Sequence, residues 1–313
     1  MLPTETADGR PRIVVLLGPT AAGKSELGMD LAERFSGEIV SADSMQVYRY
    51  MDIGTAKPTR EDRGRIVHHL IDVADPDEPF SAAVYAEQAS AAIERLHRQG
   101  RAIFLVGGTG LYIKALLRGL VETPGSDDGL RSRCREHVRR FGKLSLHEKL
   151  RETDPQAAAR IHPSDVVRVI RALEVFALTG RSVSEIRERH AFADCRYRTL
   201  KIGVSVERRE LLERIDRRTD RMIESGLVDE VRELLRRGYG ADLKPMSSLG
   251  YRHIVGCLQG DCTLAEAVQK TKGDTRRYAK RQMTWFGADP EIQWHAREVF
   301  EDVYEKIRGF LSS

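Results

Sequence analysis

The sequence lacks any long hydrophobic run. Its 313 residues contain no stretch of about 18 consecutive apolar residues, which argues against a transmembrane helix. The first residues, MLPTETADGRPR, are polar and have no apolar core of the kind that secretory signals carry. With 41% hydrophobic and 31% charged residues, the chain has the composition of a globular protein. We therefore expect no membrane contact and a cytoplasmic location.

Cysteine is also scarce. The four cysteines are Cys134, Cys195, Cys257 and Cys262, and only the last two are close in sequence. No second pair and no nearby histidine stands at the spacing of metal ligands. We expect reduced structural thiols.

A large excess of one charge is missing as well. Lys and Arg total 51 against 47 for Asp and Glu, and the net charge of +4 is too small to indicate nucleic-acid binding. The distribution is less even, because residues 131–151 hold eight Lys/Arg and two acids, and residues 270–281 hold six and one. Such stretches suit a phosphate backbone, although solvated helix faces would have the same composition.

The sequence does contain short apolar runs that end at glycine or at polar residues. Runs at 12–17, 38–42 and 102–106 have the character of buried parallel strands, and 198–206 returns to it. Helical patterns at 26–35 and 81–99 alternate with them, the second with Ser81 as N-cap and Gly100 as its stop. This alternation predicts an α/β fold with a parallel sheet of the P-loop NTPase-like kind.

The middle of the chain has a different composition. A loop-like segment at 121–126 precedes basic, helical sequence from 127 to 179 without a strong strand. At 313 residues the chain is long for one compact domain. We expect an all-α insertion at 121–197 within an α/β core formed by 1–120 and 198–313. The last part of that core is expected to be helical, with stops at Gly226, Gly238 and Gly260.

The clearest motif follows the first predicted strand. GPTAAGKS fits G-x-x-x-x-G-K-[ST], in which backbone N–H groups and a helix N-terminus converge on phosphate oxygens. Lys24 is expected to neutralise the terminal phosphate, and Ser25 to ligate Mg²⁺. The motif is typical of nucleotide-binding and ATP-binding proteins, but it does not identify the ligand as ATP. The predicted diphosphate-binding residues in the loop are Gly18, Pro19, Thr20, Ala21, Ala22, Gly23, Lys24 and Ser25.

Two further strand ends carry residues suited to a site. Asp43 follows the second strand, and GGTG at 107–110 closes the third. Since ligands gather at the carboxyl ends of parallel strands, these ends and Gly18 should face one crevice. From its position Asp43 is a proton acceptor, an acceptor for magnesium-bound water, or a cap of the next helix. Thr109 offers a hydroxyl to the crevice, unless its glycines form only a tight turn.

A pair of arginines forms a further candidate. Arg214 and Arg218 are four residues apart and so lie on one helix face. They could clamp a diphosphate, or pair with Asp216 and Glu213, and the local charge balance favours the pairing. Residues 51–58, by themselves, indicate an ordered turn.

Together the motifs resemble the tRNA dimethylallyltransferase family, also called tRNA isopentenyltransferase. The ordered series extends over nearly the whole chain, which makes a chance match very improbable. The matching segments are 18–25, 41–48, 51–58, 68–73, 106–112, 168–175, 248–252 and 275–286.

The resemblance implies a reaction. A dimethylallyl group would pass from its diphosphate to the exocyclic N6 of an adenine, with Mg²⁺ and without ATP hydrolysis. The adenine is the one 3′ of the anticodon in tRNAs that read codons starting with U, and it must leave its stack to react. The expected partners are the tRNA anticodon stem-loop and dimethylallyl diphosphate, and the simplest expectation is a monomer.

The resemblance also implies roles for residues. Asp43 would be the base or hydrogen-bond acceptor for the adenine amine, Thr109 would contact the adenine or the bridging oxygen, and Lys24, Ser25 and Arg218 would hold diphosphate and Mg²⁺. The chain departs from many relatives at Val167, where they carry a polar or basic residue. The implied tRNA-binding residues are Asp43, Ser44, Met45, Gln46, Thr109, Arg131, Val167, Arg168, Arg171, Ser248, Gly250, Tyr251 and Arg252.

Three other functions would use parts of the same sequence. A small-molecule P-loop kinase would share the loop, but it would need an ATP-specific adenine pocket and gives no reason for the basic insertion. An adenylate prenyltransferase is closer, although the insertion and the basic C-terminal third favour tRNA. An NTP-dependent RNA-binding switch would leave Asp43 and Thr109 without chemical roles.

Overall fold

The computed structural model describes residues 9–120, 125, 127–190, 196–296 and 300–313. The chain forms two compact units, one of Met1–Leu117 with Cys195–Ser313 and one of Arg118–Asp194. These divisions fall close to the predicted ones at 121 and 197. Most of the predicted 121–126 loop, Cys195 and the first eight residues lie outside the described part.

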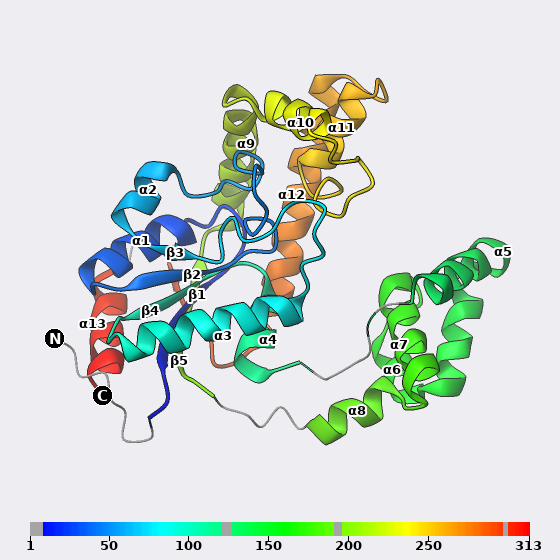
Figure 1. Ribbon diagram of the computed structural model, residues 1–313, viewed down its shortest axis with the longest axis horizontal. Helices are drawn as coiled ribbons and strands as arrows, with labels where there is room; N and C mark the ends of the chain where they lie inside the picture. Colours follow the sequence, from blue (N-terminus) through cyan, green and yellow to red (C-terminus); the bar gives the residue numbers. More distant parts are fainter. Residues whose placement is uncertain (1–8, 121–124, 126, 191–195, 297–299) are drawn as a thin grey trace. The chain divides into compact units, whose positions relative to one another are not determined.

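A parallel sheet forms the centre of the first unit (Figure 1). Its described strands are β1 (Arg12–Leu17), β2 (Glu38–Ala42), β3 (His68–His69), β4 (Ile103–Gly107), β5 (Arg198–Ser205) and β6 (Gln293–Ala296), in the order β3-β2-β4-β1-β5-β6. Every neighbouring pair is parallel, which confirms the predicted sheet. The sequence patterns did not predict β3 and β6, the two edge strands.

Several helices of this unit begin or end at the capping residues that the sequence predicted. Ser81 Oγ accepts a hydrogen bond from Val84 N at 3.2 Å, and Gly100 after the helix has a φ of 68°. Gly226, Gly238 and Gly260 all have positive φ at the predicted stops. The helices are α1 (Lys24–Arg34), α2 (Arg60–Arg65), α3 (Ala82–Arg98), α4 (Gly110–Arg118), α9 (Arg208–Glu224), α10 (Leu227–Arg236), α11 (Tyr251–Leu258), α12 (Leu264–Phe286) and α13 (Phe300–Ser312).

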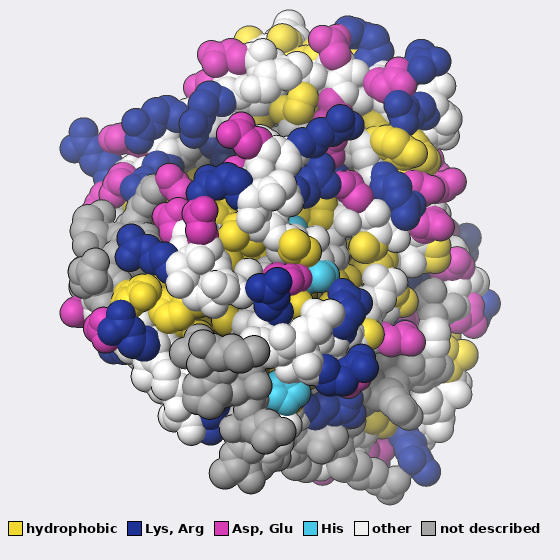
Figure 2. Space-filling model, turned by 60° about the vertical axis from the view of Figure 1, so that its left-hand side comes forward, with side chains coloured by type: hydrophobic (Ala, Val, Ile, Leu, Met, Phe, Trp, Pro, Cys, Tyr) yellow, Lys and Arg dark blue, Asp and Glu magenta, His cyan; other side chains and the backbone are white. Residues whose placement is uncertain are grey.

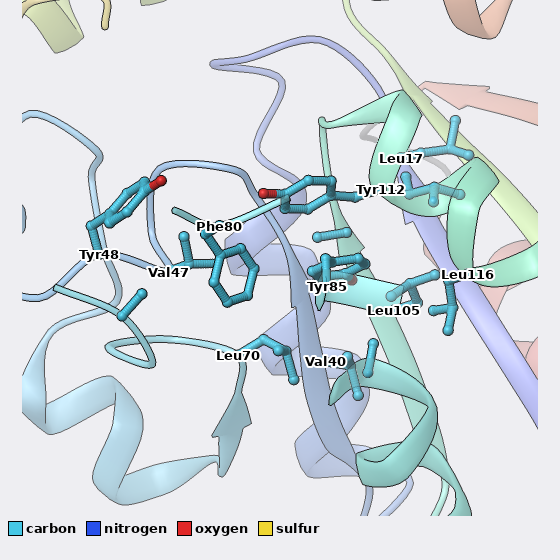
Figure 3. Packing of buried hydrophobic residues seen from close by; sticks show 14 of the residues in the cluster. Leu17, Val40, Val47, Tyr48, Leu70, Phe80, Tyr85, Leu105, Tyr112 and Leu116 are labelled. Atoms are coloured by element: carbon cyan, nitrogen blue, oxygen red, sulfur yellow. The ribbon is translucent and has the colours of Figure 1, made fainter. Parts of the chain in front are cut away.

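Apolar residues cover both faces of the sheet. Alternate residues of a strand point to opposite faces, so Val15 joins the cluster that contains α3 and α4, and Val14 joins the one with α1 and α13. Within the first cluster Tyr85 and Tyr112 stack with ring centroids 4.1 Å apart (Figure 3). Burial on both faces explains why the sequences of the central strands are rich in consecutive apolar residues.

The second unit is helical throughout its described part, as the sequence predicts. Its helices are α5 (Asp128–Thr153), α6 (Pro155–Arg160), α7 (Val166–Thr179) and α8 (Val183–His190). Leu146 and Leu150 of α5 pack with Val169 and Ile170 of α7 in a small core of their own. A kink at Gly142, with φ of 83°, interrupts α5.

Two predictions from composition concern the whole chain. None of the helices in the described ranges is long and apolar enough to cross a membrane. Cys134, Cys257 and Cys262 are free thiols.

On the face shown in Figure 2, Lys and Arg side chains lie among Asp and Glu side chains, in keeping with the small net charge.

Candidate active site

A pocket of about 1250 Å³ opens at the carboxyl ends of β1, β2 and β4. Lys24 lines it from the first residue of α1, Asp43 from the end of β2, and Gly107 from the end of β4. The strand ends predicted to face one crevice therefore do so. Residues of α9 and α12 form further parts of the wall.

The glycine-rich loop has the conformation that its residues allow. Gly18 has a φ of 145°, and a Cβ there would lie 2.7 Å from the Val204 carbonyl oxygen, so no side chain fits. Gly23, with φ of 91°, precedes the first residue of α1. The helix therefore starts two residues earlier than the apolar pattern predicted, and its N-terminus points at the loop.

Two cations approach the loop from different elements. Lys24 is buried and donates to the Pro19 carbonyl oxygen at 2.6 Å. Arg218 of α9 donates to Thr20 Oγ1 at 3.1 Å. Burial lowers the pKa of Lys24 to about 7, Arg218 adds to the shift, and Asp43 opposes it. Burial also lowers the pKa of Arg218, against the influence of Asp43.

The predicted pairing of Arg214 and Arg218 with Asp216 and Glu213 is wrong. Both acids pair with other arginines, and Arg214 instead donates to Glu210, one turn earlier. The Arg214 Nη1 atom is buried and has no hydrogen-bond partner among the described residues. Arg214 and Arg218 both line the pocket, as do Arg217 and Arg221, so α9 presents four guanidinium groups to it.

Asp43 shapes the turn that follows β2. Its Oδ1 atom accepts hydrogen bonds from Met45 N at 2.8 Å and from Gln46 N at 3.2 Å. The residues after it form a turn and not a helix, so the carboxylate caps a turn. Thr109 Oγ1 accepts from Ser44 N at 3.0 Å and so lies beside this turn.

Tyr278 of α12 lies near the same carboxylate. Burial and the charge of Asp43 raise the pKa of Tyr278 to about 12, although a hydrogen bond with Thr109 opposes the shift. The tyrosine therefore stays protonated near neutral pH. Asp43, Thr109 and Tyr278 thus form one polar group beside Lys24.

Gln282 is a site residue that the sequence patterns missed. Its Oε1 accepts from Thr20 N at 2.8 Å, and its Nε2 donates to the Gly108 carbonyl oxygen at 2.8 Å. A Cβ on Gly108 would overlap this amide, and one on Gly110 would overlap the Trp285 ring. The glycines after β4 are therefore needed for the close approach of α12. Gln282 lies in the matching segment 275–286, but no local pattern gives its role, because its two partners lie 262 and 174 residues away.

Comparison with known proteins gives the family. The sequence profile of the IPP transferases matches residues 46–289. The chain belongs to the IPP transferase family. A tRNA dimethylallyltransferase 1 of Pelobacter propionicus is 55% identical over 289 residues, which are 92% of this chain and 94% of that protein. A tRNA dimethylallyltransferase of Geobacter metallireducens is 53% identical over 302 residues, 96% of this chain and 98% of that protein.

Solved structures agree with this assignment. A full-length tRNA isopentenylpyrophosphate transferase of Bacillus halodurans matches with a TM-score of 0.71 and 41% identity, over 96% of this chain and 97% of that one. A eukaryotic dimethylallyltransferase acting on tRNA matches with a TM-score of 0.78 and 28% identity, over 96% of this chain and 77% of that one. The resemblance seen in the sequence motifs is confirmed.

The predicted tRNA-binding residues of this IPP transferase occupy different environments. Ser44, Met45 and Gln46 follow Asp43 directly. Among residues 248–252, Tyr251 is fully buried and donates its hydroxyl to Glu230 at 2.6 Å. The segment thus holds a core residue beside Arg252, whose side chain is partly exposed and paired with Asp274.

In the helical unit, Arg131 and Arg171 share one acidic partner. Both donate to Glu174, whose side chain is buried, and the backbone N–H of Asp127 donates to it too. Burial opposes ionisation of Glu174, but these hydrogen bonds outweigh it and lower the pKa of the carboxyl group. By contrast, Val167 is 79% exposed, and Arg168 beside it is largely exposed.

Metal ligands are sparse in the described ranges. No group of three or more His, Cys, Asp and Glu is placed there to hold a metal ion. Ser25 lies exposed at the start of α1 and lines the pocket. The predicted ligand of Mg²⁺ is therefore accessible.

Proposed function

We propose that this IPP transferase moves a dimethylallyl group from its diphosphate to N6 of the adenine 3′ of the anticodon in tRNAs that read U-starting codons. One observation carries the proposal: a phosphate-binding loop with cations on two sides shares its pocket with Asp43. The names of the relatives, which are tRNA dimethylallyltransferases, support the choice of acceptor.

The donor site is the pocket around Lys24. Backbone N–H groups of the loop, Lys24 and Arg218 hold the diphosphate, and the buried Arg214 Nη1 gains the acceptor that it lacks in the described structure. These groups stabilise the negative charge that grows on the leaving oxygen as the allylic C–O bond breaks. An anion there also compensates the cost of burying two cations side by side.

Mg²⁺ fits this site as a cofactor. Magnesium commonly keeps several waters and takes one or two protein oxygens together with substrate phosphates. A pocket with the Ser25 hydroxyl and few carboxylates has that donor set. When bound, the metal would supply further charge neutralisation on the diphosphate.

The acceptor is expected beside Asp43. The lone pair of the adenine N6 forms a bond to C1 of the dimethylallyl group, and the C–O bond breaks with its electron pair going to diphosphate. N6 then has one proton too many, and Asp43 accepts it. Thr109 holds the turn after Asp43 in place and offers its hydroxyl to the adenine or the bridging oxygen.

The helical unit is proposed to bind the anticodon stem-loop. Val167, Arg168 and the exposed arginines of α5 lie on its surface and suit contacts with bases and phosphates. Ser44–Gln46 and the 248–252 segment would contribute from the other unit. A monomer in the cytoplasm is the simplest form of such an enzyme.

One assay tests the proposal. The protein is incubated with labelled dimethylallyl diphosphate, Mg²⁺ and either tRNA, AMP or ATP, and the labelled product is identified. Label on the adenine next to the anticodon is the expected result. Label on AMP or ATP would instead indicate a free-nucleotide prenyltransferase, and no transfer to any acceptor would contradict the proposed function.

A further inference from the structure

Glu230 of α10 gathers an unusual number of hydrogen bonds. Its Oε2 accepts from Asp52 N at 2.9 Å and from Ile53 N at 2.7 Å, and its Oε1 accepts from Gly54 N at 3.1 Å. The Tyr251 hydroxyl donates to Oε1 as a fourth partner at 2.6 Å. Three successive backbone N–H groups on one carboxylate are charge-assisted bonds and fix the local backbone.

The segment held in this way lies packed against a buried ring. A Cβ on Gly54 would overlap the ring of Tyr251, so the backbone of the segment lies directly on that ring. Ile53, Thr55 and Ala56 line the pocket that contains the glycine-rich loop. Glu230 itself is not part of the pocket lining.

The held segment in turn fixes Gln46. Gln46 Nε2 donates to the carbonyl oxygens of Thr55 and Ala56 at 3.3 Å each, and its Oε1 accepts from Ser41 Oγ at 3.2 Å. The backbone N–H of Gln46 donates to Asp43 Oδ1. A chain of hydrogen bonds therefore leads from Glu230, through residues 52–56 and Gln46, to the carboxylate of Asp43.

We propose that Glu230 is a positioning residue for the transfer reaction, which sets the Asp43 carboxylate through the 52–56 segment and Gln46. The glycine-rich loop lies outside this chain, because its contacts run to Arg218 and Gln282. Loss of Glu230 should therefore slow the chemical step and leave diphosphate binding intact. The inference rests on the proposed function, since transfer to tRNA is one of its readouts.

The test variant is Glu230→Gln in the full-length protein. Its amide nitrogen cannot accept from the backbone N–H groups, so the segment loses at least one of its anchors. The single-turnover rate with saturating tRNA and donor should fall roughly tenfold to hundredfold, because a displacement of about 1 Å at a reacting group causes losses of this size. Affinity for inorganic diphosphate, measured by calorimetry, should stay within about threefold of wild type.

A matched variant isolates the effect. Glu233→Gln makes the same change one turn further along α10, where the carboxylate pairs only with exposed Arg236 and Arg237 among its described contacts, and should change nothing. Hydrogen exchange provides a readout that needs no activity: the amides of residues 45–46 and 52–54 should exchange faster only in Glu230→Gln.

The outcomes are separable. An unchanged rate together with unchanged exchange at residues 45–46 would overturn the inference. Equal losses of transfer rate, diphosphate affinity and melting temperature would also overturn it, because they indicate a merely structural role. If the wild-type protein fails to modify tRNA, the proposed function fails, and the exchange at residues 45–46 still decides whether Glu230 positions Asp43.

Discussion

At the scale of single residues, Lys24 combines burial with a cationic neighbour. Both lower its pKa, to about 7, so in the free protein the lysine is only partly charged at neutral pH. Bound diphosphate must raise this pKa, because an anion favours the ammonium form. Donor binding and protonation of Lys24 are therefore coupled.

The coupling predicts a pH dependence. Below pH 7 Lys24 is already charged, so it adds no pH dependence to the affinity for the donor. Above pH 7 binding of dimethylallyl diphosphate takes up a proton, and its affinity falls by at most about tenfold per pH unit until the pKa of the complex is passed. Calorimetry between pH 7 and 9, in buffers of different ionisation enthalpy, measures the uptake. The Lys24→Gln variant should bind weakly and without uptake, and equal uptake in both proteins would contradict this assignment.

A second prediction concerns Asp43. Asparagine keeps the Oδ1 that caps the turn, so Asp43→Asn should change the free energy of unfolding by less than about 1 kcal/mol. It removes the negative charge that accepts the proton from N6. The single-turnover rate with saturating tRNA and donor should fall by roughly 10²–10⁴-fold. A rate within a few-fold of wild type would reduce Asp43 to its structural role in the turn.

At the scale of elements, α12 joins two loops of the pocket. Gln282→Met has a similar volume but can neither accept from Thr20 N nor donate to the Gly108 carbonyl oxygen. Each unsatisfied buried group costs about 1–3 kcal/mol. The affinity for donor should therefore fall by at least about tenfold, measured by calorimetry. Gln269→Met on the exposed side of the same helix is the control, and equal affinities of the two variants would contradict the bridging role.

The elements that the sequence predicted are those with local signals. The central strands β1 and β4 are buried on both faces and consist almost entirely of apolar residues, whereas β3 and β6 are short, half-exposed edge strands without such a run. Helices α2 and α4 were likewise not predicted. The same division holds in the site. The glycine-rich loop is contiguous in sequence, but Arg218 meets Thr20 across 198 residues and Glu230 meets Asp52 across 178. Contacts over such separations follow from the topology of the sheet and carry no local pattern.

At the scale of the whole molecule, positive charge is largely balanced by neighbouring acids. Figure 2 shows this mixture on one face, and in the helical unit Glu174 engages two of the predicted tRNA-binding arginines. Nearby basic residues in one sequence stretch therefore differ in role. Arg131 is half-buried and pairs with buried Glu174, while Arg139 and Arg140 are 73% and 69% exposed and share Glu136.

This difference predicts which arginines bind tRNA phosphates. Each phosphate contact that is lost lowers the slope of log affinity against log salt by roughly one unit, because fewer counterions are released. The double variant Arg139→Gln, Arg140→Gln should thus flatten the slope by up to about two units and leave thermal unfolding unchanged. Arg131→Gln should leave the slope nearly unchanged, but lower the free energy of unfolding by about 1–3 kcal/mol, because buried Glu174 loses a charged partner.

Filter binding of tRNA over a series of salt concentrations, together with denaturant unfolding of each variant, measures both quantities. If the double variant keeps the wild-type slope, Arg139 and Arg140 serve only to solvate α5. If Arg131→Gln flattens the slope at unchanged stability, the ion pair with Glu174 must open when tRNA binds. Arg131 would then contact a phosphate, as the basic composition of residues 131–151 suggested.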